Sequence, residues 1–246
     1  MQDETTSGWW IHERKADFMR YQGLVIAWLA VVAVGSSALG NEMGWSQINQ
    51  KNGVVVWQKT IPGSRMMAFR GLKRLKVPIA KVAYVLTNAD VEQKKRWIDM
   101  VKDFRVVEKI TPQINISYSS YDLPFPLDDR DFVIKSTQIA DRANRRLTIE
   151  LKSVEHAQYP AIRSAGVRAQ LFASSFILQD AGAEGTDVTC EIHTDPMGWL
   201  PAWVVNVINR NWPVNTLSRL EEEALKPDTK DHPYTIEQLA IQPPNP

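Results

Sequence analysis

The sequence contains little that would support covalent or metal chemistry. One of its 246 residues is a cysteine, Cys190, so an internal disulfide and a cysteine-based zinc cluster are excluded. The four histidines are scattered, and a formal net charge of +1 provides no field that would attract nucleic acid. The chain also lacks a Gly-x-Ser-x-Gly elbow, a phosphate-binding glycine loop and a dinucleotide fingerprint. We therefore predict no catalytic residue, no metal, no cofactor and no nucleic-acid partner.

A few polar groups could in principle carry chemistry, but each has a plainer interpretation. His193 alternates with Glu191 and Asp195 on one predicted strand, which is more typical of a solvated strand face than of a metal site. Cys190 falls on the apolar phase of the same strand, which indicates an inert small side chain. The acidic residues at 128–131 are typical of caps and surface pairs.

One long apolar run lies near the N-terminus, at residues 23–34, and small residues follow it up to Gly40. Its length is nearer to the core of a signal peptide than to the roughly 20 residues of a spanning helix. We predict an N-terminal extension and signal peptide over residues 1–40 and an exported protein, periplasmic or secreted. Met19 would make a more typical start of translation. The alternative is a membrane anchor through residues 21–39.

No internal repeat or Gly/Ser linker divides the rest of the chain. Its length and its 44% hydrophobic content suit one globular domain, which we place at residues 41–227. The remaining residues, 228–246, are polar and end in Pro-Pro-Asn-Pro, so we predict a loose tail. We expect the protein to be a monomer.

Alternation of apolar and polar residues predicts an antiparallel sheet. A short helix over residues 42–49 is expected before two strands, at 54–59 and 66–76. Two helical patterns follow, the second with a basic run at 94–96 that we interpret as a solvated face. From residue 105 onward, short runs of period two are joined by short turns, as in antiparallel hairpins. The predicted fold class is α+β: a curved antiparallel sheet of about seven to nine strands wrapped around a long C-terminal helix, with a helical insertion after the second strand.

The C-terminal helix carries a stripe of large apolar residues. Trp203, Val204, Val207 and Ile208 recur at spacings of three and four, which places them on one helical face. A sheet with one apolar face has to be covered, so we expect this stripe to face the sheet. Pro213 lacks the N–H donor that a helix interior needs, and we predict that it weakens or hinges the helix.

Several motifs occur in a fixed order along residues 45–225. The most specific are Arg-Asp-Phe-Val at 130–133 and Pro-x-Trp-x-x-Asn at 201–206, and Phe-Arg-Gly at 69–71 precedes them. In this order the motifs resemble the START family, the steroidogenic-acute-regulatory-protein-related lipid-transfer domains of the helix-grip group. The resemblance implies a tunnel for one lipid or sterol between the sheet and the C-terminal helix. Where some sterol-binding members have a buried basic residue, this chain has Ser136, which can form hydrogen bonds but cannot neutralise a charge.

We predict that inward side chains line this tunnel and that a proline-flanked loop opens it beside the helix. The predicted lining residues are Ile116, Tyr118, Phe132, Ile134, Ser136, Leu147, Ile149, Leu151, Leu171, Val188, Cys190, Ile192, Trp203, Val204, Val207, Ile208 and Asn211. The predicted gate is formed by Leu123, Phe125, Leu127 and Pro213. The plainer alternatives are a solid core without a tunnel and a loop that is only a rigid connector.

The expected function is non-covalent binding of one lipid or sterol and its carriage or presentation between membranes. Exposing an acyl chain to water costs about 0.8 kcal/mol per CH₂, so a carrier has to enclose it. Loading would require transient contact with a membrane surface. Two alternatives stay open: a helix-grip enzyme of the cyclase or aromatase type, and a lipid-sensing adaptor that binds without transfer.

Overall fold

The computed structural model describes residues 44–123, 125, 127–160 and 166–241. The chain divides into two units, Met1–Ser46 and Gln47–Pro246, and the second unit contains the fold. The predicted signal peptide or anchor and the start at Met19 lie outside the described residues. No helix in the described part of the chain is long and apolar enough to span a bilayer.

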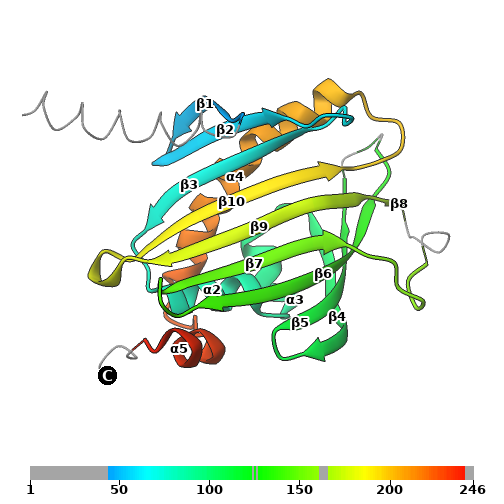
Figure 1. Ribbon diagram of the computed structural model, residues 1–246. Coiled ribbons are helices and arrows are strands. Elements are labelled where there is room, and N and C mark those ends of the chain that lie inside the picture. Colours follow the sequence, from blue (N-terminus) through cyan, green and yellow to red (C-terminus); the bar gives the residue numbers. More distant parts are fainter. Residues whose placement is uncertain (1–43, 124, 126, 161–165, 242–246) are drawn as a thin grey trace, which may run out of the picture. The chain divides into compact units, whose positions relative to one another are not determined.

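The described strands form one ten-stranded sheet (Figure 1). Their order is β1-β2-β3-β10-β9-β7-β6-β5-β4, and the short β8 pairs in parallel with β6. The strands are β1 (Ser46–Lys51), β2 (Val54–Thr60), β3 (Met67–Leu75), β4 (Val101–Thr111), β5 (Ile114–Tyr121), β6 (Arg130–Asp141), β7 (Arg146–Ser153), β8 (Val167–Arg168), β9 (Gln170–Asp180) and β10 (Thr186–Asp195).

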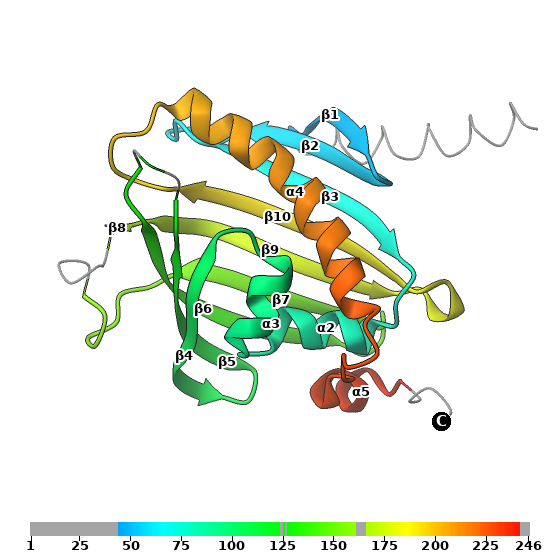
Figure 2. The ribbon, with the colours of Figure 1, turned by 180° about the vertical axis from the view of Figure 1, so that it is seen from behind.

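The helices cover one face of the sheet. Figure 2 shows α4 running diagonally across that face with α2 and α3 beside it. The described helices are α2 (Ile79–Thr87), α3 (Val91–Trp97), α4 (Ala202–Ala224) and α5 (Pro233–Leu239), with a 3₁₀ turn at Gly182–Glu184. The Asp90 carboxylate caps α3 by accepting hydrogen bonds from the N–H groups of Glu92 and Gln93. The predicted α+β helix-grip architecture is confirmed.

The prediction of a helix over residues 42–49 was wrong, because β1 occupies Ser46–Lys51. Asn52 and Gly53 join it to β2 with φ values of 53° and 75°, the positive pair that a tight two-residue hairpin turn requires. The Asn-Gly pair therefore makes a hairpin rather than a helix-to-strand connection. As a result, the helical insertion follows the third strand instead of the second.

The core lies between α4 and the middle of the sheet. Cys190, Phe176 and Ile149 lie side by side on three neighbouring strands and pack in one cluster with Leu217 and Leu220 of α4. We call this side of the sheet the inner face and the opposite side the outer face. Burial raises the pKa of the Cys190 thiol to about 12, so the thiol is uncharged at neutral pH.

The helix approaches the sheet most closely at Gly71 on β3. A Cβ atom at Gly71 would lie 2.5 Å from the Cβ atom of Pro213 and 3.2 Å from the Sγ atom of Cys190, so the absence of a side chain permits the contact. The helix continues through Pro213, which is buried at this point. The structure thus places the predicted hinge residue where the helix is held against the sheet.

The prediction of a loose tail was wrong for residues 228–241. Helix α5 lies there, with Thr235 and Leu239 buried. The backbone N–H of His232 donates a hydrogen bond to the carbonyl oxygen of Ala80 on α2. Tyr234 and Leu239 pack against the core, so a few apolar residues in a polar segment are enough to attach it.

We expect Gly71→Ala to lower the free energy of unfolding by about 1–3 kcal/mol, because the added methyl group would overlap Pro213. Urea denaturation followed by circular dichroism measures this change. An unchanged midpoint would contradict the close contact between α4 and β3.

Candidate functional site

The register of the strands defines which residues share the inner face. Ser174 on β9 pairs with Leu151 on β7, Leu151 with Ser136 on β6, and Ser136 with Asn115 on β5. Directly opposed residues point to the same side of a sheet, so this row crosses the inner face from strand to strand. The row mixes small polar side chains with apolar ones.

Most of the predicted lining residues on the sheet lie on the inner face. These residues are Phe132, Ile134, Ser136, Leu147, Ile149, Leu151, Leu171, Val188, Cys190 and Ile192. A bulge in the β9–β10 pairing brings Leu171 opposite Thr194 and keeps both side chains buried. Their contact with a ligand stays a prediction.

The placement of Ile116 and Tyr118 on the inner face was wrong. Ile116 pairs with Lys135 and Tyr118 with Val133, and these positions point to the outer face. There the two residues form a small apolar cluster with Val133, against which Tyr159 packs. The apolar phase of β5 faces outward because a distant segment of the chain covers this part of the sheet.

The predicted stripe of α4 does not face the sheet at the N-terminal half of the helix. Trp203 is 71% exposed, and Val207 and Ile208 are more than half exposed. Val204 is partly buried. Asn211, also predicted to line the tunnel, is exposed, and its side-chain N–H donates to the carbonyl oxygen of Val207.

The buried stripe of α4 has the same helical spacing but a different phase. It consists of Val205, Asn209, Pro213, Val214, Thr216, Leu217, Leu220, Glu223 and Ala224. The prediction failed because this stripe contains polar Asn209 and Thr216, while apolar Trp203 and Val207 point away from the sheet.

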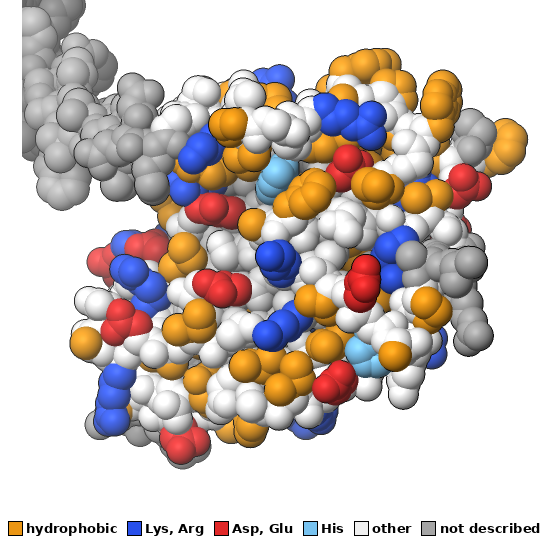
Figure 3. Space-filling view, turned by 45° about the vertical axis from the view of Figure 1, so that its right-hand side comes forward, with side chains coloured by type: hydrophobic (Ala, Val, Ile, Leu, Met, Phe, Trp, Pro, Cys, Tyr) orange, Lys and Arg blue, Asp and Glu red, His pale blue; other side chains and the backbone are white. Residues whose placement is uncertain are grey.

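An apolar surface lies at the end of the molecule where α4 begins. Phe125 is 97% exposed and Trp199 88% exposed, and the exposed residues Trp203, Val207 and Ile208 continue along the helix. We call these five residues the apolar end patch. Figure 3 shows hydrophobic side chains gathered in the upper right of the view, over the start of α4.

Arg130 joins the two loops at this end. Its buried guanidinium donates hydrogen bonds to the carbonyl oxygens of Pro196 (2.7 Å) and Met197 (3.3 Å) in one loop. It also donates to those of Asp128 and Asp129 in the other. The predicted gate loop, in which Leu123 and Leu127 are partly buried, is thereby held beside the segment that leads into α4.

One ammonium group is buried at the corner between α2, α3 and β4. Lys94 Nζ donates to the carbonyl oxygens of Val85 (3.0 Å) and Leu86 (2.9 Å) at the end of α2. It also lies 5.2 Å from the ring centroid of Phe104. Burial lowers the pKa of Lys94 to about 7. The interpretation of residues 94–96 as a solvated face was therefore wrong for Lys94.

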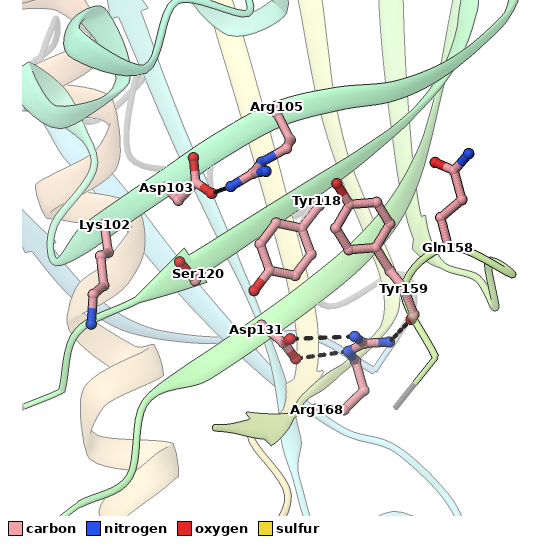
Figure 4. Close-up of a pocket in the computed structure, with 9 residues that line it drawn as sticks. All are labelled: Lys102, Asp103, Arg105, Tyr118, Ser120, Asp131, Gln158, Tyr159 and Arg168. Atoms are coloured by element: carbon pink, nitrogen blue, oxygen red, sulfur yellow. Dashed lines mark hydrogen bonds and ion pairs between the residues drawn. The ribbon is translucent and has the colours of Figure 1, made fainter. Parts of the chain in front are cut away.

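The outer face carries a pocket of about 400 Å³ (Figure 4). Tyr118 and Tyr159 stack there with ring centroids 4.8 Å apart. Arg168 Nε donates to Asp131 Oδ1 at 2.7 Å, and another guanidinium nitrogen donates to the carbonyl oxygen of Tyr159 at 3.0 Å. Arg105 pairs with Asp103. Since these charges are already paired within the pocket, we interpret it as the attachment of the segment around Tyr159 to the sheet.

The START domain family model matches residues 31–222. The chain belongs to the START family. Proteins of this family bind and transfer lipids. The chain is 27% identical over 197 residues to an uncharacterised protein of Pseudomonas aeruginosa, covering 80% of this chain and 94% of that protein. It is 30% identical over 172 residues to START domain-containing protein 10 of Mus musculus, covering 67% of this chain and 56% of the relative, so it spans little more than half of that protein.

Solved START structures share the fold. Human STARD10 superposes with a TM-score of 0.68 at 25% identity, over 79% of this chain and 78% of that one. A lipid transfer protein fragment from Xanthomonas axonopodis gives 0.64 at 27% identity, over 74% and 99%. The family assignment made from the ordered motifs is confirmed.

Three buried residues of this START domain were not predicted to be buried from the sequence. Asn209 lies four residues after Val205 and four before Pro213. This spacing would have predicted that Asn209 is buried if its polarity had been ignored. Ser174 lies within a mixed run that shows no clear alternation. Lys94 is indistinguishable in sequence from its exposed neighbour Lys95.

The buried Lys94 predicts a stability that rises with pH. An unfolded lysine keeps its proton up to about pH 10.4, whereas the folded one loses it above about pH 7. The folded state binds fewer protons between these values, so the stability increases across this window, on the order of 4 kcal/mol. Lys94→Met should remove this increase and the exposed Lys95→Met should not. Urea denaturation at pH 6.5, 8 and 9.5 tests this, and equal slopes for both variants would refute it.

Proposed function

We propose that this START domain binds one lipid or sterol between α4 and the inner face of the sheet and exchanges it at a membrane surface without covalent chemistry. The observation that carries this proposal is a contrast along α4. Its C-terminal half buries Leu217 and Leu220 completely, whereas its N-terminal half leaves Trp203 and Val207 largely exposed. We therefore assign membrane contact to the first part of the helix and attachment to the sheet to its C-terminal half.

The inner face offers an environment suited to an acyl chain or sterol ring. Phe132, Ile134, Leu151 and Ile192 lie on this face and are only partly buried. Enclosing about 14 methylene carbons would contribute roughly 11 kcal/mol relative to water. A ligand could thus replace direct packing of the helix on the sheet in this region.

The apolar end patch supports docking to a bilayer. Tryptophan is favourable at a membrane interface because its ring is apolar and its N–H can still form hydrogen bonds. The patch lies at the end where α4 begins, so docking would bring the opening of the site against the lipid. We further propose that the protein acts as a monomer. We also propose that it is exported, and the N-terminal sequence of the purified protein tests export.

Replacing both Trp199 and Trp203 with serine should weaken binding to phosphatidylcholine vesicles roughly tenfold or more, because two interfacial anchors are lost. Co-sedimentation measures this binding. Ile110→Ser, on the exposed part of β4, is the matched control and should bind like the unmodified protein. Docking through another surface would be indicated if both variants lost binding equally.

Protein purified from its own host should contain one bound lipid class, which native mass spectrometry can detect. Movement of that lipid from donor to acceptor vesicles should accelerate when the protein is added. Binding without acceleration would favour the sensing adaptor, and a chemically altered lipid would favour an enzyme. Persistent absence of bound lipid, together with no uptake from vesicles, would count against the proposal.

A further inference from the structure

Asn209 on α4 and Ser174 on the inner face of β9 are two of the buried polar side chains that have an unpaired atom within the described part of the chain. Asn209 on α4 is 7% exposed and Ser174 on β9 is 8% exposed. The Nδ2 atom of Asn209 and the Oγ atom of Ser174 have no hydrogen-bond partner among the described residues. Leaving buried polar atoms unpaired is unfavourable, so native proteins usually supply a partner, which can be a ligand.

The contacts of α4 with β3 fix the position of Asn209 along the direction of the strands. We call this position its level over the sheet. One turn before it, the Oδ1 atom of Asn206 accepts a hydrogen bond from the backbone N–H of Met67 at 3.1 Å. One turn after it, Pro213 lies on Gly71. The helix therefore advances from the level of residue 67 to that of residue 71 across this interval, and Asn209 lies at the level between them.

Ser174 lies in the row of residues at that same level. Phe69 on β3 pairs with Ile192 on β10, and Ile192 pairs with Ser174 on β9. The next row contains Phe176, whose ring centroid is 6.1 Å from that of Trp212 on α4. Since Trp212 is one turn beyond Asn209 and Phe176 is two residues beyond Ser174, the two unpaired groups face the same part of the interior.

The side chains of this row are uncharged. From β2 to β5 its inner-face residues are Gln58, Phe69, Ile192, Ser174, Leu151, Ser136 and Asn115. Within this stretch no side chain can ionise, so a phosphate would find no cation and a quaternary ammonium no carboxylate. A buried charge without a partner is strongly unfavourable.

We propose, building on the lipid-binding function proposed above, that Asn209 and Ser174 bind the polar end of the lipid and that this end is an uncharged hydroxyl or ester group. The amide N–H of Asn209 donates to the ligand oxygen. The Ser174 hydroxyl donates to that oxygen or accepts from a ligand hydroxyl. Diacylglycerols and sterols both carry this chemistry.

The test uses probes that differ only in the polar group. Diacylglycerol, phosphatidic acid and phosphatidylcholine with identical fluorescent acyl chains are titrated against the full chain, and a fluorescent sterol is measured separately. We expect diacylglycerol or the sterol to bind at least tenfold more tightly than either phospholipid. The preferred one of these two identifies the source of the uncharged group.

Asn209→Leu and Ser174→Ala should each weaken binding of the preferred probe about five- to tenfold. The ligand-free variants should unfold at the same or a higher temperature, because each loses an unpaired buried polar atom. Asn215→Leu, at an exposed position of α4, is the control and should bind normally. If Asn209→Leu does not fold, Ser174→Ala alone decides, since it removes a single oxygen atom.

Tight binding of phosphatidylcholine or phosphatidic acid would overturn this assignment and leave the proposed lipid-binding function intact. Undiminished binding by Ser174→Ala would overturn it as well. Failure of the unmodified protein to bind all four probes would count against the lipid-binding function itself.

Discussion

The contact between Pro213 and Gly71 determines how the rest of this structure is arranged. It brings the helix to the sheet at a position where a side chain on β3 would overlap the helix. Beyond this point, α4 packs with Leu217 and Leu220 fully buried. Before it, Val205 and Asn209 face the interior, whereas the larger apolar residues Trp203 and Val207 point to solvent. One close contact therefore divides α4 into a half that packs with buried leucines and a half that presents large apolar residues to solvent.

The orientation of the N-terminal half of α4 would be unfavourable if the interior were only a solid core. Tryptophan is usually buried and asparagine usually exposed, yet Trp203 points outward and Asn209 inward. Rotating the helix would correct both, but the Pro213 contact and the bond from Met67 to Asn206 prevent it. Under the proposed function both placements become favourable, because a lipid inside pairs with Asn209 and a membrane outside receives Trp203.

The period of two along the strands and the helical pattern around the basic run at 94–96 made the sheet and helix α3 predictable from local sequence. The phase of α4 was not predictable in this way, because Val205, Asn209 and Pro213 are spaced as regularly as Trp203 and Val207. Choosing between these stripes requires knowing that a glycine on β3 lies opposite Pro213. The orientation of Tyr118 likewise depends on Tyr159, more than thirty residues away in sequence, which covers the outer face.

The distribution of charge inside the molecule supports the same view of the ligand. The buried ammonium group of Lys94 lies over the ring of Phe104 on β4, and it donates hydrogen bonds to two carbonyl oxygens at the end of α2. Even with these partners, burial lowers its pKa to about 7, so the corner between α2, α3 and β4 disfavours a positive charge. The polar side chains in the row through Ser174 carry only hydroxyl and amide groups. A charged group placed against this row would find no side chain of opposite charge in it, so an uncharged lipid fits the row better.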